Sequence, residues 1–177
     1  MRMKQLVFRT FILSALLFSL SLGAAERKPR KPLPPVKVAC VGNSITYGMK
    51  LDNRVQECYP AQLQGLLGPA YKVGNFGKSG ATLLRQGHRP YMEQEEFRQA
   101  MDFAGDIVVI HLGVNDTDPC NWPHLQDAFA ADYLALIDSL RSANPKARFL
   151  LARIPGFPAK AGQLPGRPGH GCILRSG

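Results

Sequence analysis

The most strand-like run in the chain reads DIVVIHL and covers residues 106–112. It is almost entirely apolar and rich in β-branched residues, and Gly113 follows it directly, which is typical of a strand buried on both faces. Comparable runs occur at residues 36–41, which read VKVACV, at 71–76 and at 148–151. The sequence therefore predicts a β-strand in each of these four segments.

Helical patterns separate the predicted strands. Residues 59–67 have Pro60 in the first turn and leucines on one face, and residues 93–103 begin with acidic side chains. A third apolar stripe predicts a long helix over about residues 123–142. Alternating strands and helices, with uninterrupted apolar strands, predict an α/β fold in which a doubly wound parallel sheet is covered on both faces.

The N-terminal segment has the composition of an export signal. Residues 1–25 combine a basic leader, an apolar run from Phe11 to Leu20 and small residues up to Ala25. The apolar run is shorter than the roughly 20 residues that span a bilayer. We therefore expect a cleaved signal peptide and a periplasmic or secreted protein with no stable membrane span, rather than a membrane anchor. Residues 26–35, rich in proline and basic residues, predict an extended linker.

The net charge of +9 resides at the two ends of the chain. The leader and the linker carry +3 each and residues 153–177 carry +4, so residues 36–152 are close to neutral at −1. A nucleic-acid-binding surface would place the positive charge on the domain itself, so we exclude that function. Residues 36–152 are predicted to form the domain. Residues 153–177 show no strand or helix periodicity, which predicts a disordered tail and a domain apparently lacking its C-terminal βα unit.

The cysteines do not predict a metal site. Cys40, Cys58, Cys120 and Cys172 include no C-x-x-C pair and no accompanying histidine cluster. Export allows a disulfide, and Cys58 with Cys120 is the candidate pair, with buried unpaired thiols as the alternative. Asp116 and Asp118 are expected to cap a turn and the next helix rather than to bind a cation. We expect no metal and no cofactor.

Loops rich in glycine and small polar residues follow three of the strands, at residues 42–48, 77–82 and 113–117. In parallel sheets, ligands bind beyond the carboxyl ends of the strands. Ser44, which follows a buried strand and Gly42, is placed to act as a nucleophile. The backbone N–H groups of Ser44 and Gly80 and the side-chain amide of Asn115 are candidate donors to an oxyanion.

These loops carry the residues of a known family. GNSIT at 42–46 resembles the first sequence block of the SGNH/GDSL hydrolases, SGAT at 79–82 the second and GVND at 113–116 the third, in the same order and spacing. The flanking segments at 46–48, 59–63 and 75–77 resemble those of exported bacterial members labelled sialate O-acetylesterase-like or acylhydrolase.

The resemblance implies a flavodoxin-like three-layer α/β/α domain. It also implies hydrolysis of carboxyl esters, often acetyl groups on sugars, without metal or cofactor, so the expected partner is a small-molecule or glycan ester. Ser44 would be the nucleophile, and Gly80 and Asn115 would complete the oxyanion hole with the Ser44 backbone.

The sequence departs from the family pattern in two places. Asn43 replaces the aspartate of many members, and no Asp-x-x-His segment is present to supply the base and its orienting acid. His88 and His124 are expected in a loop and at a helix start, His111 beside the site, and His170 in the C-terminal segment. The base and the orienting acid therefore have no assigned residues.

Two alternatives to an active esterase follow from the missing base. One is a non-catalytic carbohydrate-binding protein, with Trp122, Tyr47 and Tyr91 as candidate stacking residues. The other is a truncated or frameshifted hydrolase that is inactive. An esterase impaired by the missing Asp and His remains the principal prediction.

Overall fold

The computed structural model of the protein describes residues 33–152. The predicted signal peptide, most of the predicted linker and the segment 153–177 with His170 and Cys172 lie outside the described residues. Within them, no helix combines the length and the apolar character needed to cross a membrane.

Four parallel strands form the sheet, in the order β2-β1-β3-β4. They are β1 (Val36–Gly42), β2 (Tyr71–Gly77), β3 (Ile107–His111) and β4 (Arg148–Leu151), each within about two residues of its prediction. The register pairs Gly42 of β1 with Gly77 of β2 and with His111 of β3. Three strands therefore end at the same level of the sheet.

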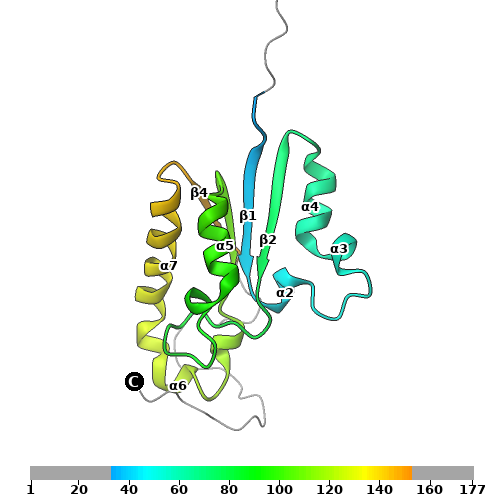
Figure 1. The fold of residues 1–177 in the computed structure, drawn as a ribbon. Helices are drawn as coiled ribbons and strands as arrows, with labels where there is room; N and C mark the ends of the chain where they lie inside the picture. The colour runs from blue at the N-terminus through cyan, green and yellow to red at the C-terminus, as the bar shows by residue number, and fades with distance from the viewer. Residues whose placement is uncertain (1–32, 153–177) are drawn as a thin grey trace, which may run out of the picture. The chain divides into compact units, whose positions relative to one another are not determined.

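Helices cover both faces of this sheet (Figure 1). Helix α4 (Tyr59–Leu67) lies on one side, while α5 (Glu95–Phe103) and α7 (Phe129–Ala143) pack side by side on the other. This arrangement follows from right-handed crossovers between parallel strands, because the chain moves across the sheet in opposite directions before and after β2. The three-layer α/β/α prediction is confirmed. The βα unit predicted to be lacking would follow β4, outside the described residues.

Two short helices were not predicted. They are α2 (Ser44–Tyr47) and α3 (Arg54–Glu57), and each has only four residues. A single turn cannot show the apolar repeat by which longer helices are recognised.

The helix predicted over residues 123–142 is interrupted. Its first part is α6 (Trp122–Leu125), and the 3₁₀ turn η3 (Gln126–Ala128) separates it from α7. Leu125, with φ −123° and ψ 0°, departs from helical geometry and breaks the hydrogen-bond ladder there. Similarly, the 3₁₀ turn η1 (Tyr91–Glu93) precedes α5, which begins two residues later than predicted.

The hydrophobic core lies between the sheet and the α5/α7 layer. Apolar side chains of the central strands contact the helices there, and the segment 81–91 closes the layer at the carboxyl end of the strands. The fully buried residues of the core include Val41, Leu83, Leu84, Tyr91, Ile110 and Leu136. The segment following β2 is therefore part of the core as well as a loop at the predicted site.

Candidate active site

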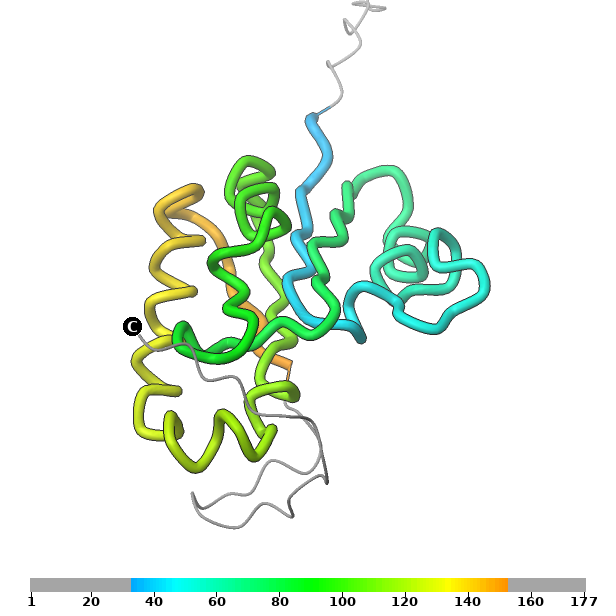
Figure 2. Tube along the Cα trace, turned by 60° about the horizontal axis from the view of Figure 1, so that its bottom comes forward, coloured from blue at the N-terminus to red at the C-terminus, as the bar shows by residue number. Residues whose placement is uncertain are grey.

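The predicted site loops meet at the carboxyl edge of the sheet, which Figure 2 turns toward the viewer. The Lys78 N–H, just after β2, donates to the Gly42 carbonyl at 2.9 Å. The Asn43 N–H donates to the His111 carbonyl at 3.4 Å. These bonds continue the strand pairing past the ends of the strands and hold the starts of the first two loops against their neighbours.

Ser44 is the first residue of α2 and is half-buried. Asn43 caps this helix, because its Oδ1 accepts a 3.0 Å bond from the Ile45 N–H. A β-carbon at Gly42 would overlap the Thr46 side chain and approach the His111 carbonyl oxygen to 2.8 Å. Glycine at 42 therefore allows the chain to turn directly from β1 into the helix that carries Ser44. The Ser44 N–H, at the first helical position, is not used by the helix itself.

Gly80 and Asn115 lie on neighbouring segments joined by a direct contact. The Asn115 Nδ2 donates to the Ala81 carbonyl at 2.8 Å, and this leaves the second hydrogen of the amide for another acceptor. Gly80 has φ +77°, a left-handed conformation that glycine adopts without strain. The loops predicted to hold the two residues are therefore adjacent, as expected.

Asp116 belongs to the third loop and holds the end of the second loop in place. Its fully buried carboxylate accepts bonds from the Leu83 N–H at 2.9 Å and the Leu84 N–H at 2.7 Å. Burial raises the pKa of Asp116 to about 6, and the two N–H bonds partly oppose that shift. The expectation that Asp116 caps the next helix is wrong, since its partners lie more than 30 residues away. Asp118 does stabilise a local turn, by accepting from the Cys120 N–H at 2.9 Å.

None of the described histidines has the environment of a catalytic base paired with an acid. The His88 ring bonds the Gly80 carbonyl and the Asn121 amide. His111 lies at the end of β3, where burial lowers its pKa. His124 is exposed in α6. The base and the orienting acid thus remain without assigned residues.

The predicted Cys58–Cys120 disulfide is wrong. Cys58 is a buried free thiol at the start of α4, and its Sγ accepts a 3.4 Å bond from Asn75 Nδ2. Cys120 is disulfide-bonded, but not to Cys58. The buried Cys40 is also free, and burial raises the pKa of its thiol to about 11. Cys40 therefore stays protonated at neutral pH and is no rival nucleophile to Ser44.

The candidate sugar-stacking residues serve other contacts. Tyr91 is fully buried, and its hydroxyl donates to the Phe76 carbonyl at 2.6 Å. Trp122 is buried and packs edge-on against Phe129, with ring centroids 5.5 Å apart. Tyr47 is partly buried, and the Arg54 guanidinium lies 4.1 Å from the centre of its ring. The stacking role is therefore wrong for Tyr91, and packing accounts for Trp122.

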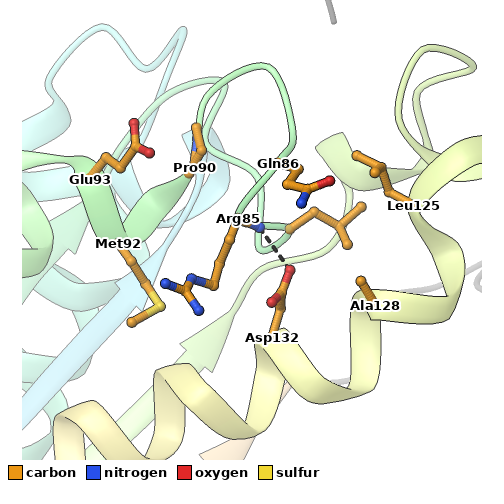
Figure 3. Close-up of a pocket in the computed structure, with 9 residues that line it drawn as sticks. Arg85, Gln86, Pro90, Met92, Glu93, Leu125, Ala128 and Asp132 are labelled. Carbon is orange, nitrogen blue, oxygen red and sulfur yellow. Dashed lines mark hydrogen bonds between the residues drawn. The ribbon is translucent and has the colours of Figure 1, made fainter. Parts of the chain in front are cut away.

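A cavity of about 520 Å³ lies between the segment 84–93 and the start of α7 (Figure 3). Arg85, Glu93 and Asp132 contribute polar groups to its lining, together with apolar side chains such as Met92 and Leu125. The Arg85 N–H donates to Asp132 Oδ2 at 2.8 Å across it. Ser44, Gly80 and Asn115 do not line this cavity. Across residues 33–152, histidine, cysteine and acidic side chains form no cluster of three or more that could hold a metal ion.

The chain resembles known esterases in sequence and fold. The model of the GDSL-like lipase/acylhydrolase family matches residues 40–170. An acetylxylan esterase of Xylanibacter ruminicola is 47% identical over 106 residues, which are 60% of this chain and 22% of that protein. The chain thus spans about a fifth of the length of this curated relative.

Solved structures share the fold at lower identity. The SGNH-hydrolase family esterase AlinE4 superposes with a TM-score of 0.50 and 20% identity, over 68% of this chain and 60% of AlinE4. A family two carbohydrate esterase from Clostridium thermocellum, solved in complex with cellohexaose, gives a TM-score of 0.52 and 21% identity over 68% and 43% of the two chains.

The family match includes the three loops and the site residues on which the sequence-based prediction rests. Ser44, Gly80 and Asn115 all lie within the matched region, on loops that the fold gathers at one edge of the sheet. The chain therefore belongs to the GDSL-like lipase/acylhydrolase family.

Proposed function

We propose that this domain is a carboxyl-ester hydrolase that removes acetyl groups from carbohydrate, with Ser44 as its nucleophile. One observation carries the proposal: the three loops that bear Ser44, Gly80 and Asn115 begin at one level of the sheet and are hydrogen-bonded to one another. Membership of an acylhydrolase family supports the same reaction type.

In the proposed reaction, the Ser44 Oγ attacks the ester carbonyl and loses its proton to a base. The developing oxyanion accepts hydrogen bonds from the Ser44 N–H, the Gly80 N–H and the free hydrogen of the Asn115 amide. Collapse of the tetrahedral intermediate breaks the bond to the sugar oxygen, which takes the proton back from the base and leaves as a hydroxyl, while the acetyl group stays on Ser44. Water then attacks this acyl-enzyme, releases acetate and restores the serine.

The base is the component for which no residue is assigned. The oxyanion hole and substrate binding without a complete triad leave a residual acceleration of roughly 10³–10⁴ over water. We therefore expect slow turnover that still depends on Ser44. If a base is lacking, added imidazole should accelerate the Ser44-dependent part of the rate, because it accepts the serine proton from solution.

The proposed substrate is acetylated xylan or a related acetylated glycan. The 47% identity to an acetylxylan esterase supports this choice, and so does the fold shared with carbohydrate esterases. An exported protein, as residues 1–25 predict, would meet such a polysaccharide outside the cytoplasm.

The test is release of acetate from acetylated xylan and of nitrophenol from p-nitrophenyl acetate. Ser44→Ala should abolish release from both, whereas Ser142→Ala, an exposed serine on α7, should not change either rate. Equal rates for Ser44→Ala and the unmodified protein would exclude Ser44 as the nucleophile. Turnover of the nitrophenyl ester without release from xylan would retain the reaction and reject the substrate.

A further inference from the structure

Two consecutive side chains bind the carbonyl groups of the two peptide units that flank the Gly80 Cα. Arg89 Nη1 donates to the Ser79 carbonyl at 3.0 Å, and His88 Nε2 lies 3.2 Å from the Gly80 carbonyl. Gly80 thus has both flanking peptide groups held by side chains from the segment that follows its loop. Neither His88 nor Arg89 belongs to the sequence blocks that identify the family in this chain.

The hydrogen-bond network fixes the form of the His88 ring. The side-chain amide of Asn121 makes three contacts. Its Oδ1 accepts a hydrogen bond from the backbone N–H of His88 at 3.3 Å. Its Nδ2 lies 2.9 Å from the ring Nδ1 of His88 and 3.1 Å from the Asn115 carbonyl. If the amide were flipped, its oxygen would face the Asn115 carbonyl oxygen, acceptor against acceptor. Its NH₂ group would face the backbone N–H of His88, donor against donor. Nδ2 is therefore the donor, so His88 Nδ1 is unprotonated and Nε2 carries the hydrogen that it donates to Gly80.

Backbone pairing holds residues 88 and 89 beside Gly80. The Thr82 N–H donates to the Arg89 carbonyl at 2.8 Å, and the Tyr91 N–H donates to the Thr82 carbonyl at 2.9 Å. Together they form a short parallel bridge between Thr82 and Pro90. The buried Tyr91 anchors this bridge to β2 through its hydroxyl. Although His88 and Arg89 are exposed, the backbone that presents them is fixed to the core.

The bond from Arg89 determines the direction of the Gly80 N–H. The Ser79 carbonyl and the Gly80 N–H belong to one peptide group, and no peptide bond in the described chain is cis. In a trans peptide these two groups point in opposite directions. A guanidinium that holds the carbonyl therefore directs the N–H away from itself. It also polarises the peptide, which strengthens the N–H as a donor.

We propose that Arg89 and His88 are positioning residues for the oxyanion hole: they clamp the peptide groups on either side of Gly80 so that its N–H faces the reacting ester. This proposal rests on the proposed function, since it concerns the same reaction. Arg89 acts on the peptide that contains the donor N–H. His88, oriented by Asn121, holds the following peptide and links the second loop to the third.

Arg89→Met tests the clamp, because methionine keeps an unbranched side chain but removes the charge and the donors. We expect kcat for p-nitrophenyl acetate to fall by roughly tenfold, less than the 10²–10³ lost when an oxyanion donor is removed outright. KM should change little, because the bond matters most in the transition state. Arg89→Lys, which keeps a cationic donor, should recover part of the rate. Arg98→Met is the matched control, since Arg98 lies on α5 in an exposed ion pair with Glu95.

His88→Gln tests the second contact. The glutamine amide can replace the Nε2–H donor to the Gly80 carbonyl, so this variant should retain most of the activity. His88→Leu cannot donate and should lose kcat without a change in KM. Equal kcat values for the two variants would overturn the role of His88.

An NMR measurement separates this proposal from the proposed function. Losing the Arg89 bond depolarises the Ser79–Gly80 peptide, so the Gly80 amide proton should move upfield in Arg89→Met and stay unchanged in Arg98→Met. An unmoved Gly80 resonance overturns the clamp whatever the activity. A moved resonance with no Ser44-dependent turnover in the unmodified protein supports the clamp and rejects the proposed function. A moved resonance with Ser44-dependent turnover and unchanged kcat overturns the positioning role.

Discussion

Asp116 is the residue on which the relative placement of two site loops depends. Its carboxylate is fully buried, yet it carries no partner charge within hydrogen-bonding contact and relies on the Leu83 and Leu84 N–H groups. These bonds compensate only part of the cost of burying the charge, and for that reason the pKa of Asp116 rises from 3.8 to about 6. The position of the second loop is thus obtained at a cost in stability at neutral pH.

The pH dependence of stability should reveal this cost. Between about pH 4 and pH 6, the unfolded chain has released the Asp116 proton while the folded chain retains it. The stability that this group contributes is therefore fully present below pH 4 and is lost as the pH rises through 6. For a shift of about two pKa units, the loss is about 3 kcal/mol. The measurement is the free energy of unfolding by urea at several pH values, for the protein and for Asp116→Asn.

The difference between the two proteins isolates the titration of Asp116, because the other groups titrate in both. The advantage of the unmodified protein over Asp116→Asn should shrink by about 3 kcal/mol from pH 4 to pH 7. A difference that stays constant over this range would mean that the carboxyl titrates normally in the folded state.

The position of the site residues could be predicted from the sequence, but their contacts could not. Ser44, Gly80 and Asn115 each follow an apolar strand, and strand ends can be read from local sequence. The residues that hold them, Asp116 and Asn121, contact chain segments more than 30 positions away. Nothing in the local sequence distinguishes such a contact from the turn or cap that Asp and Asn ordinarily form.

At the scale of elements, the junction between β2 and α2 sets how close the first and second site loops approach each other. A β-carbon at Gly77 would lie 2.6 Å from the Thr46 carbonyl carbon and 2.7 Å from the Tyr47 Cα, which are backbone atoms of α2. Backbone cannot move aside as a flexible side chain can. Glycine at 77 therefore lets the end of β2 pass directly against the helix that begins with Ser44.

Gly77→Ala should force these elements apart. We expect a loss of roughly 3 kcal/mol or more in stability, together with loss of the Ser44-dependent activity, because overpacking against backbone is poorly relieved. Gly65→Ala is the control: Gly65 lies inside α4, nothing lies within 4 Å of its added β-carbon, and alanine should stabilise that helix by about 0.5–1 kcal/mol. Thermal melts of the two variants should move in opposite directions, and a stable, active Gly77→Ala would contradict the close junction.

Helix α7, with 15 residues, is the longest of the helices that cover the sheet, although it is shorter than the predicted helix. Leu136 is 1% exposed and contacts the core, whereas Leu134 on the same helix is 61% exposed. Leu136→Ala should cost about 2–5 kcal/mol, and Leu134→Ala should change stability by only about 0.5 kcal/mol. Urea unfolding monitored by circular dichroism measures both, and similar losses would show that α7 packs differently.

The sequence predicted the strands more accurately than the helices for a physical reason. Apolar β-branched runs mark buried strands clearly, and all four were found. Helix α2 is set by the Asn43 cap and by contacts with β2, α3 packs on α4, and no proline or glycine lies at residues 124–128, where the helix before α7 breaks. The cysteine pairing failed because spacing carries no information on which thiols meet in space.

At the scale of the whole molecule, the order β2-β1-β3-β4 places β4 at an edge of the described sheet. Successive side chains of a strand point to opposite faces, and Leu150 and Leu151 are each 55% exposed. Apolar surface is thus accessible on both faces of the last part of β4. An exposed apolar edge strand is a site at which protein chains associate by strand pairing.

The double substitution Leu150→Lys and Leu151→Lys should suppress this association, because lysine on an edge strand opposes pairing by charge repulsion. Light scattering coupled to gel filtration, over a range of protein concentrations, would show the unmodified protein increasing in apparent mass and the double variant remaining at that of a monomer. Leu66→Lys is the control, since Leu66 is 85% exposed but lies on helix α4, where no strand edge is available. If Leu66→Lys reduced association as much as the double variant, net charge would explain the effect and the edge of β4 would not. If the double variant associated like the unmodified protein, the contact would lie elsewhere on the surface.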